Sequence, residues 1–239
     1  MKFIGLIFSC LLLFSLSACA DDATTFNGML ALANKGDAEA QYHVGMMYNN
    51  GIGTQKDPKK AFGWFEKSTG SNDPLGAYKL GCYYAGQFAG VVTTDHTAAL
   101  KYKLLAAKAG YSLAQHDVAL IYAGQGNYDK AVIWLKQAGE QGYEGALYLL
   151  ARVYSVGSGV PRDDVMAFVY LKRAVQVSNM ESDANSQTML KDMMANLSES
   201  ELAKAQSLIA AWKPQPTALT IRAEGGIAEG EDYLRKAQQ

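Results

Sequence analysis

The stretch Gly36–Gly70, GDAEAQYHVGMMYNNGIGTQKDPKKAFGWFEKSTG, contains two helical patterns separated by a glycine-rich turn. In the first pattern, small residues and a tyrosine recur at helical spacing; they are Gly36, Ala40, Val44, Gly45 and Tyr48. The turn is Gly51–Gly53. Asp57 followed by Pro58 predicts the start of a second helix, because aspartate caps free backbone amides and proline suits the first helical position. That helix has an apolar face formed by Ala61, Trp64 and Phe65.

The same frame recurs three more times along the chain. Its landmark tyrosines follow one another at intervals of 36, 38 and 32 residues; they are Tyr48, Tyr84, Tyr122 and Tyr154. A period of about 20 to 50 residues is typical of a solenoid, in which each helix pair buries its apolar face against the next. Glycine and alanine let two helices approach closely, while the aromatic residues fill the space between pairs. The sequence therefore predicts an all-α, right-handed α/α solenoid of about four helix-pair repeats with terminal capping helices.

The repeat has the pattern A-x-x-x-[LV]-G-x-x-Y, then G-x-G, then D-x-x-x-A-x-x-W, and it resembles the Sel-one-like repeat family, relatives of the tetratricopeptide repeat. The resemblance extends from about Gly36 to Ser178. The third copy departs from the pattern, because between Tyr122 and Ala131 it has only the short connection AGQGNYDK of the tetratricopeptide type. The resemblance implies a scaffold for protein–protein interaction that is not an enzyme.

Residues 1–20 have the features of a secretory signal peptide. Lys2 is followed by the apolar run Phe3–Leu16 and then by small residues. The run is shorter than a typical membrane-spanning helix. Two cleavage sites remain open. The residues LSAC, ending at Cys19, resemble a bacterial lipobox and predict lipidation of that cysteine, whereas ACA, ending at Ala20, would release a soluble periplasmic protein. We therefore expect a periplasmic protein or an outer-membrane lipoprotein, with secretion as a further alternative.

Composition limits the other function classes. The formal net charge is −1 and the pI is about 6.3, which argues against a nucleic-acid partner. Of the three cysteines, only Cys82 lies in the expected folded part, so the sequence predicts no disulfide framework. The histidines have no second histidine or cysteine at metal-ligand spacing, and there is no nucleophile-elbow motif. We therefore expect neither a metal site, nor a cofactor, nor enzyme activity.

The solenoid domain is predicted to extend over residues 26–212, including helices that cover its two ends. A short helix over Phe26–Asn34 is expected to cover the N-terminal end. At the other end, Ser198 and Glu201 predict a capping box at the start of the last helix. Residues 213–239 are predicted to form a flexible tail, because they are polar and contain several glycines, with a short helix over Glu229–Gln239 as an alternative.

A concave groove is the expected binding site, by analogy with tetratricopeptide relatives, in which the first helix of each pair lines the groove. Positions around the small landmark residues would point into it; they are Tyr42, Met46, Asn49, Tyr78, His116, Leu120, Tyr148 and Arg152. One ring from each repeat would form an aromatic stripe that suits an extended peptide or protein segment; the four rings are those of Tyr42, Tyr78, His116 and Tyr148. Alternatively, these rings pack on the neighbouring helix.

Two other functions remain open for the same groove. Its rings could stack on a carbohydrate or a peptidoglycan fragment. A cell-wall-related hydrolase would instead need a pair of carboxylates or a Ser-Lys pair, and the expected groove positions contain neither.

Overall fold

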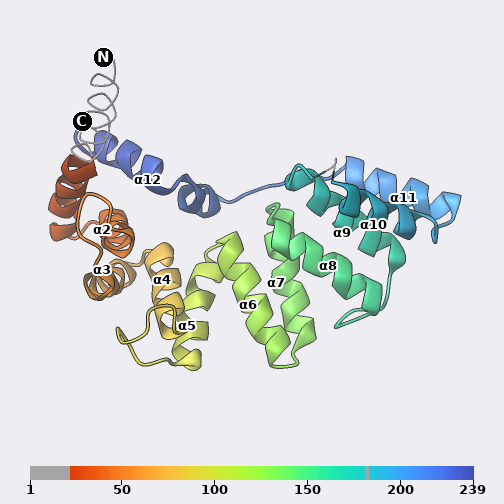
Figure 1. Cartoon of the computed structure of the whole chain (residues 1–239), viewed down its shortest axis with the longest axis horizontal. Coiled ribbons are helices and arrows are strands. Elements are labelled where there is room, and N and C mark those ends of the chain that lie inside the picture. Colours follow the sequence, from red (N-terminus) through yellow and green to blue (C-terminus); the bar gives the residue numbers. More distant parts are fainter. Residues whose placement is uncertain (1–21, 181–182) are drawn as a thin grey trace, which may run out of the picture. The chain divides into compact units, whose positions relative to one another are not determined.

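The computed structural model describes residues 22–180 and 183–239, in which every regular element is a helix (Figure 1). The chain forms two compact units. Unit 1 comprises the described residues up to 102 together with 224–239, and unit 2 comprises residues 103–223. The expected signal peptide and Cys19 lie outside the described residues. Within the described part, none of the helices combines the length and the apolar character that a membrane span needs.

Unit 1 begins with a helix over residues 22–34, close to the expected N-terminal helix. The helices that follow in chain order are α2 (Ala38–Asn50), α3 (Pro58–Gly70), α4 (Pro74–Tyr84) and the first part of α5 (His96–Lys108). Helix α3 packs against both α2 and α4. The predicted helix pair over Gly36–Gly70 is therefore confirmed.

Unit 2 continues the same succession of helices (Figure 1). Their bounds are α6 (Ser112–Gly124), α7 (Tyr128–Glu140), α8 (Glu144–Val156), α9 (Asp164–Val177), α10 (Ala184–Met194) and α11 (Glu199–Ala210). Consecutive helices from α6 to α9 pack against one another, and α10 and α11 both contact α9. The all-α fold class and the stacking of helix pairs are confirmed, and the predicted capping box is present at the start of α11.

The close approach of α2 and α3 depends on one glycine. A Cβ atom at Gly45 would lie 2.6 Å from the ring of Phe65, so a larger residue there would displace that ring. Phe65 is fully buried at the centre of α3. The second helix of the pair starts as predicted, since the Asp57 side chain accepts a hydrogen bond of 3.0 Å from the Lys60 amide with Pro58 at the first helical position. Small residues at the crossing and a capped start thus fix this pair.

The expected flexible tail is not what the structure shows. Residues Ala218–Ala237 form helix α12, interrupted at Gly226, whose φ of 58° and ψ of −127° are not helical. In unit 2, the amide of Thr217 and the hydroxyl of Thr220 both donate to the side-chain oxygen of Gln141, at 3.1 and 2.6 Å. The nitrogen of the same Gln141 side chain donates to the Gly110 carbonyl at 2.8 Å.

The last part of α12 is held within unit 1. The Tyr233 hydroxyl donates to a carboxylate oxygen of Asp37 at 2.6 Å. Leu234 is buried and belongs to the same apolar cluster as Phe26 and Met29. These contacts join residues far apart in the chain, so a local reading of composition does not predict them. Glycine content indicated disorder here, yet one of the glycines, Gly230, is buried.

Burial of Tyr170 on α9 predicts that the stability of unit 2 falls at high pH. Burial, followed by the charge of the neighbouring Tyr154 hydroxyl, raises the pKa of its hydroxyl to about 12. Because the ordinary tyrosine pKa is 10.0, the unfolded chain loses this proton first. The contribution of the protonated Tyr170 hydroxyl to the free energy of unfolding is therefore complete below pH 10 and is lost between pH 10 and about 12. Urea unfolding of the native protein should show this loss, and a Tyr170→Phe variant should lose less stability over the same range; equal losses would contradict the prediction.

Candidate functional site

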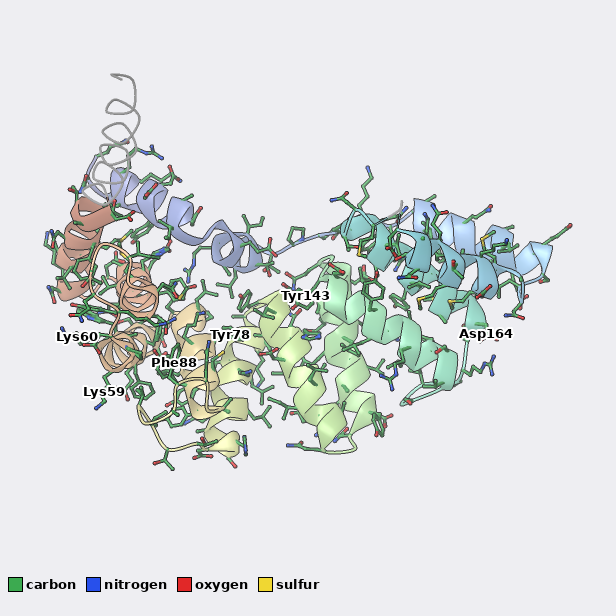
Figure 2. The ribbon with its side chains drawn as sticks, viewed as in Figure 1. Lys59, Lys60, Tyr78, Phe88, Tyr143 and Asp164 are labelled. Carbon is green, nitrogen blue, oxygen red and sulfur yellow. The ribbon has the colours of Figure 1, made fainter. Side chains whose placement is uncertain are left out.

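Three of the expected groove residues are buried in unit 1. Tyr42, Asn49 and Tyr78 are only 7%, 8% and 7% exposed. The Tyr42 ring lies 6.2 Å from the ring of Phe65, and Asn49 accepts a buried hydrogen bond of 2.8 Å from the Tyr83 hydroxyl. Tyr78 lies on α4 (Figure 2). These three side chains are packing residues, as the alternative interpretation of the rings stated. Met46, on α2, is partly exposed.

The other two rings of the expected stripe belong to unit 2 and are partly buried. The His116 ring lies 4.9 Å from the ring of Tyr143, at the turn that leads into α8 (Figure 2). Burial, followed by the charges of Asp117 and Glu144, raises the pKa of Tyr143. Tyr148 packs against the core of unit 2. A stripe of freely exposed rings is therefore not formed.

Two expected groove residues, Leu120 and Arg152, do come together. They line a cleft of about 390 Å³ in unit 2, which we call the α6–α8 cleft. Its lining comes from three helices and one loop and consists of Ala119, Leu120, Ala123, Tyr128, Ala131, Val132, Leu135, Leu149, Arg152, Val153, Val156 and Ser158. The volume is within the range of about 300–1,000 Å³ that is usual for ligand sites.

Helical periodicity explains why these side chains converge. The cleft positions on α8 are 149, 152, 153 and 156, and those on α7 are 128, 131, 132 and 135. Both sets follow the spacing i, i+3, i+4, i+7, which places side chains on one face of a helix. Two adjacent helices thus each turn one mainly apolar face toward the same space.

The floor and the rim of the cleft differ in exposure. The floor is buried and apolar, with Ala119, Ala131, Val132 and Leu135 at most 4% exposed. The rim consists of large apolar side chains that solvent reaches: Leu120 is 46% exposed, Tyr128 is 49% and Val156 is 64%. Large exposed apolar side chains gathered around a concavity are typical of an interaction site, whereas scattered ones are not.

Gly159, in the loop after α8, follows Ser158 of the cleft lining and lies against the start of α7. It has a φ of 74°, and a Cβ atom there would lie 2.7 Å from the backbone carbon of Tyr128. The loop can therefore lie against the start of α7 only because this residue has no side chain. Beyond Tyr128 lies a polar recess, to which Asn127 and Asp129 contribute.

Arg152 is the only charged residue that lines the cleft. Its side chain is exposed, and no ion pair or side-chain hydrogen bond joins it to any residue in the described part of the chain. By contrast, Arg162 in the nearby loop makes two hydrogen bonds to Asp164, of 2.9 and 3.0 Å. The cleft thus offers one free positive charge beside an apolar floor.

Another apolar concavity lies between α9 and the two helices that follow it. Its lining consists of Phe168, Lys172, Gln176, Met194, Leu202, Gln206, Ile209, Ala210 and Trp212.

Within residues 22–180 and 183–239, no group of three or more His, Cys, Asp or Glu side chains is placed to hold a metal ion.

Sequence reasoning missed most of the cleft. Tyr128 is not among the expected residues because those all lie on the first helix of a pair, whereas Tyr128 begins a second helix. The spacing of three further lining residues marks one face of α8 but does not tell whether a neighbouring helix covers that face. Sequence reasoning therefore missed Leu149, Val153 and Val156. The short connection before α7, visible in the sequence, was the available signal that this repeat differs from the others.

The Sel1 repeat family matches four successive segments, residues 38–72, 74–111, 112–143 and 145–176. Together these segments make up more than half of the chain, so the chain belongs to the Sel1 repeat family. Sel1 repeat proteins are generally non-catalytic scaffolds, and their repeats generally mediate protein–protein interactions.

Relatives of the chain come from a virus and from bacteria. A putative sel1-like repeat-containing protein of Acanthamoeba polyphaga mimivirus is 28% identical over 129 residues, which is 53% of this chain and 23% of the viral protein. A Sel1 repeat protein from Oxalobacter formigenes is similar in structure, with a TM-score of 0.56 and 28% identity over 62% of each chain. A protective antigen of uropathogenic Escherichia coli with an SLR fold is 20% identical, with a TM-score of 0.37, over 97% of this chain and 64% of that one. The chain thus spans about a quarter of the viral relative and under two thirds of the Oxalobacter one.

Proposed function

We propose that this protein is an interaction scaffold that binds an apolar segment of a protein partner in the α6–α8 cleft. The observation that carries the proposal is the exposed apolar rim of Leu120, Tyr128 and Val156 around a buried apolar floor. Burying such side chains against a partner is favourable, at about 25 cal/mol per Å² of apolar surface. The size of the cleft suits side chains of a partner rather than a whole helix or domain.

The chemistry of the cleft favours a protein segment over the other two functions. A sugar needs several hydrogen-bonding side chains beside a stacking ring, but the lining offers only Ser158, Arg152 and the Tyr128 hydroxyl. Two of the rings on which a sugar was expected to stack, Tyr42 and Tyr78, are buried. None of the twelve lining residues is acidic, so the cleft lacks the pair of carboxylates that a glycoside hydrolase uses.

A Leu120→Glu variant tests the proposal, since it places a charge on the apolar rim and leaves the buried floor unchanged. The matched control is Leu105→Glu, because Leu105 is 47% exposed against 46% for Leu120 and lies outside the cleft. In crosslinking capture from the source cells, we expect a protein that the native chain and the control retain and that Leu120→Glu loses. Equal capture by all three folded proteins, as judged by circular dichroism, would exclude the cleft as the binding site.

We also propose that the scaffold acts in the bacterial cell envelope. The support is the sequence of residues 1–20, with its positive start, apolar run and LSAC ending at Cys19. Mass spectrometry of the mature N-terminus tests this. A lipid on Cys19 would indicate a lipoprotein, an N-terminus after Ala20 would indicate a soluble periplasmic or secreted form, and an intact N-terminus would contradict export.

A further inference from the structure

Arg152 gives the α6–α8 cleft a preference that its apolar lining alone would not have. Its guanidinium group is exposed, lines the cleft, and has no ion-pair partner in the part of the chain that the structure describes. It lies one helical turn from both Leu149 and Val156, which also line the cleft. A group bound by the guanidinium would therefore lie beside a side chain that occupies the apolar space.

Three other cations of unit 2 have contacts of their own. Arg162 is held by Asp164 through two hydrogen bonds. Lys130 lies over the ring of Tyr122 at 5.3 Å, and Lys136 lies over the ring of Tyr154 at 5.6 Å. Of these four cations, Arg152 alone lines the cleft and has no such contact within the described residues.

The geometry points to one kind of occupant: we infer that the cleft binds a protein segment in which a large apolar side chain is adjacent to a carboxylate. The apolar side chain fills the space between α7 and α8, and the carboxylate pairs with Arg152. An arginine fork binds a carboxylate through two parallel hydrogen bonds, which fixes orientation as well as adding affinity. This inference rests on the proposed function, because it names the chemistry of the partner at the same site.

Selection from a phage-displayed library of short random peptides tests the inference. Peptides would be selected on the full chain and then counter-selected on the Leu120→Glu variant. We expect the remaining peptides to share a large apolar residue next to Asp or Glu. Each selected peptide would then be synthesised with its acid replaced by the matching amide, and its affinity for the protein would be measured by fluorescence anisotropy.

Two variants of the protein separate charge from shape. Arg152→Gln should weaken the acidic peptide about fivefold, as expected for an exposed ion pair, and should leave the amide peptide unchanged. The weakening should shrink at high salt, because exposed charges are screened. Asp129→Asn is the matched control: it removes a charge of the opposite sign from the neighbouring polar recess, so the preference for the acidic peptide should persist.

The outcomes distinguish this inference from the proposed function. Peptides that depend on Leu120 but show no acidic residue, or bind Arg152→Gln as tightly as the native protein, would overturn the inference while the scaffold function stands. If no peptide distinguishes native protein from Leu120→Glu, both proposals fail. Self-association of the native chain that Leu120→Glu abolishes, measured by sedimentation, would show that a second copy occupies the cleft and would also overturn the inference.

Discussion

Replacing Phe65 by alanine is expected to lower the free energy of unfolding of unit 1 by about 3–5 kcal/mol. The ring is fully buried and lies against Gly45 of α2 and within 6.0 Å of the Tyr83 ring of α4. Its removal would leave a cavity at the point where three helices meet, and a glycine cannot fill that cavity. Native-state hydrogen exchange of the amides of α2, α3 and α4 would measure the loss locally.

Phe62→Ala is the matched control for this prediction. Phe62 is on the same helix and also contacts the Tyr83 ring, at 5.4 Å, but it is only partly buried. Truncation of Phe62 should therefore lower the free energy of unfolding by less than truncation of Phe65 does. Equal losses for the two variants would mean that burial at Phe65 does not determine the stability of the helix pair.

Replacing Gln141 by alanine is expected to lower the free energy that holds the start of α12 on unit 2 by about 1–3 kcal/mol and to release this segment. The Gln141 side chain accepts hydrogen bonds from Thr217 and Thr220 and donates to Gly110 and Gln115. Alanine would leave the Thr217 amide and the Gln115 side-chain oxygen without these partners, while the Gly110 carbonyl keeps its hydrogen bonds from the Thr217 and Thr220 hydroxyls. Hydrogen exchange of residues 215–223 should accelerate on the order of tenfold, since local opening reflects the lost stabilisation.

Gln137→Ala is the control, because Gln137 is exposed in the last turn of α7, just before Gln141, and makes one long contact of 3.4 Å, with Gln115. It should leave exchange in residues 215–223 unchanged. If both variants exchange like the native protein, the side chain of Gln141 does not hold this segment.

The repeats could be predicted from the sequence because their determinants are local. Asp57 with Pro58, and Ser198 with Glu201, cap helices within a few residues of themselves, and both caps are present as predicted. Helix α12 could not be predicted in the same way. Its contacts join Tyr233 to Asp37 and Thr220 to Gln141, so its order depends on surfaces formed by distant parts of the chain.

The site was only partly predictable for a similar reason. Two of the expected groove residues, Leu120 and Arg152, line the same cleft. Spacing does not tell which of these faces a neighbour covers, so Tyr42 and Tyr78 were expected in a groove although they are buried. The sequence gives the direction of a side chain around its helix, whereas exposure depends on how neighbouring helices pack.

The separation between a buried floor and an exposed rim in the α6–α8 cleft has an evolutionary consequence. Surface substitutions usually change stability by less than about 0.5 kcal/mol, whereas core substitutions cost several times more. Under the proposed function, changes at Leu120, Tyr128 or Val156 would therefore alter which partner is recognised while the floor keeps the repeats folded. A gene for such a protein can acquire a new specificity by a few point mutations, without passing through an unfolded intermediate.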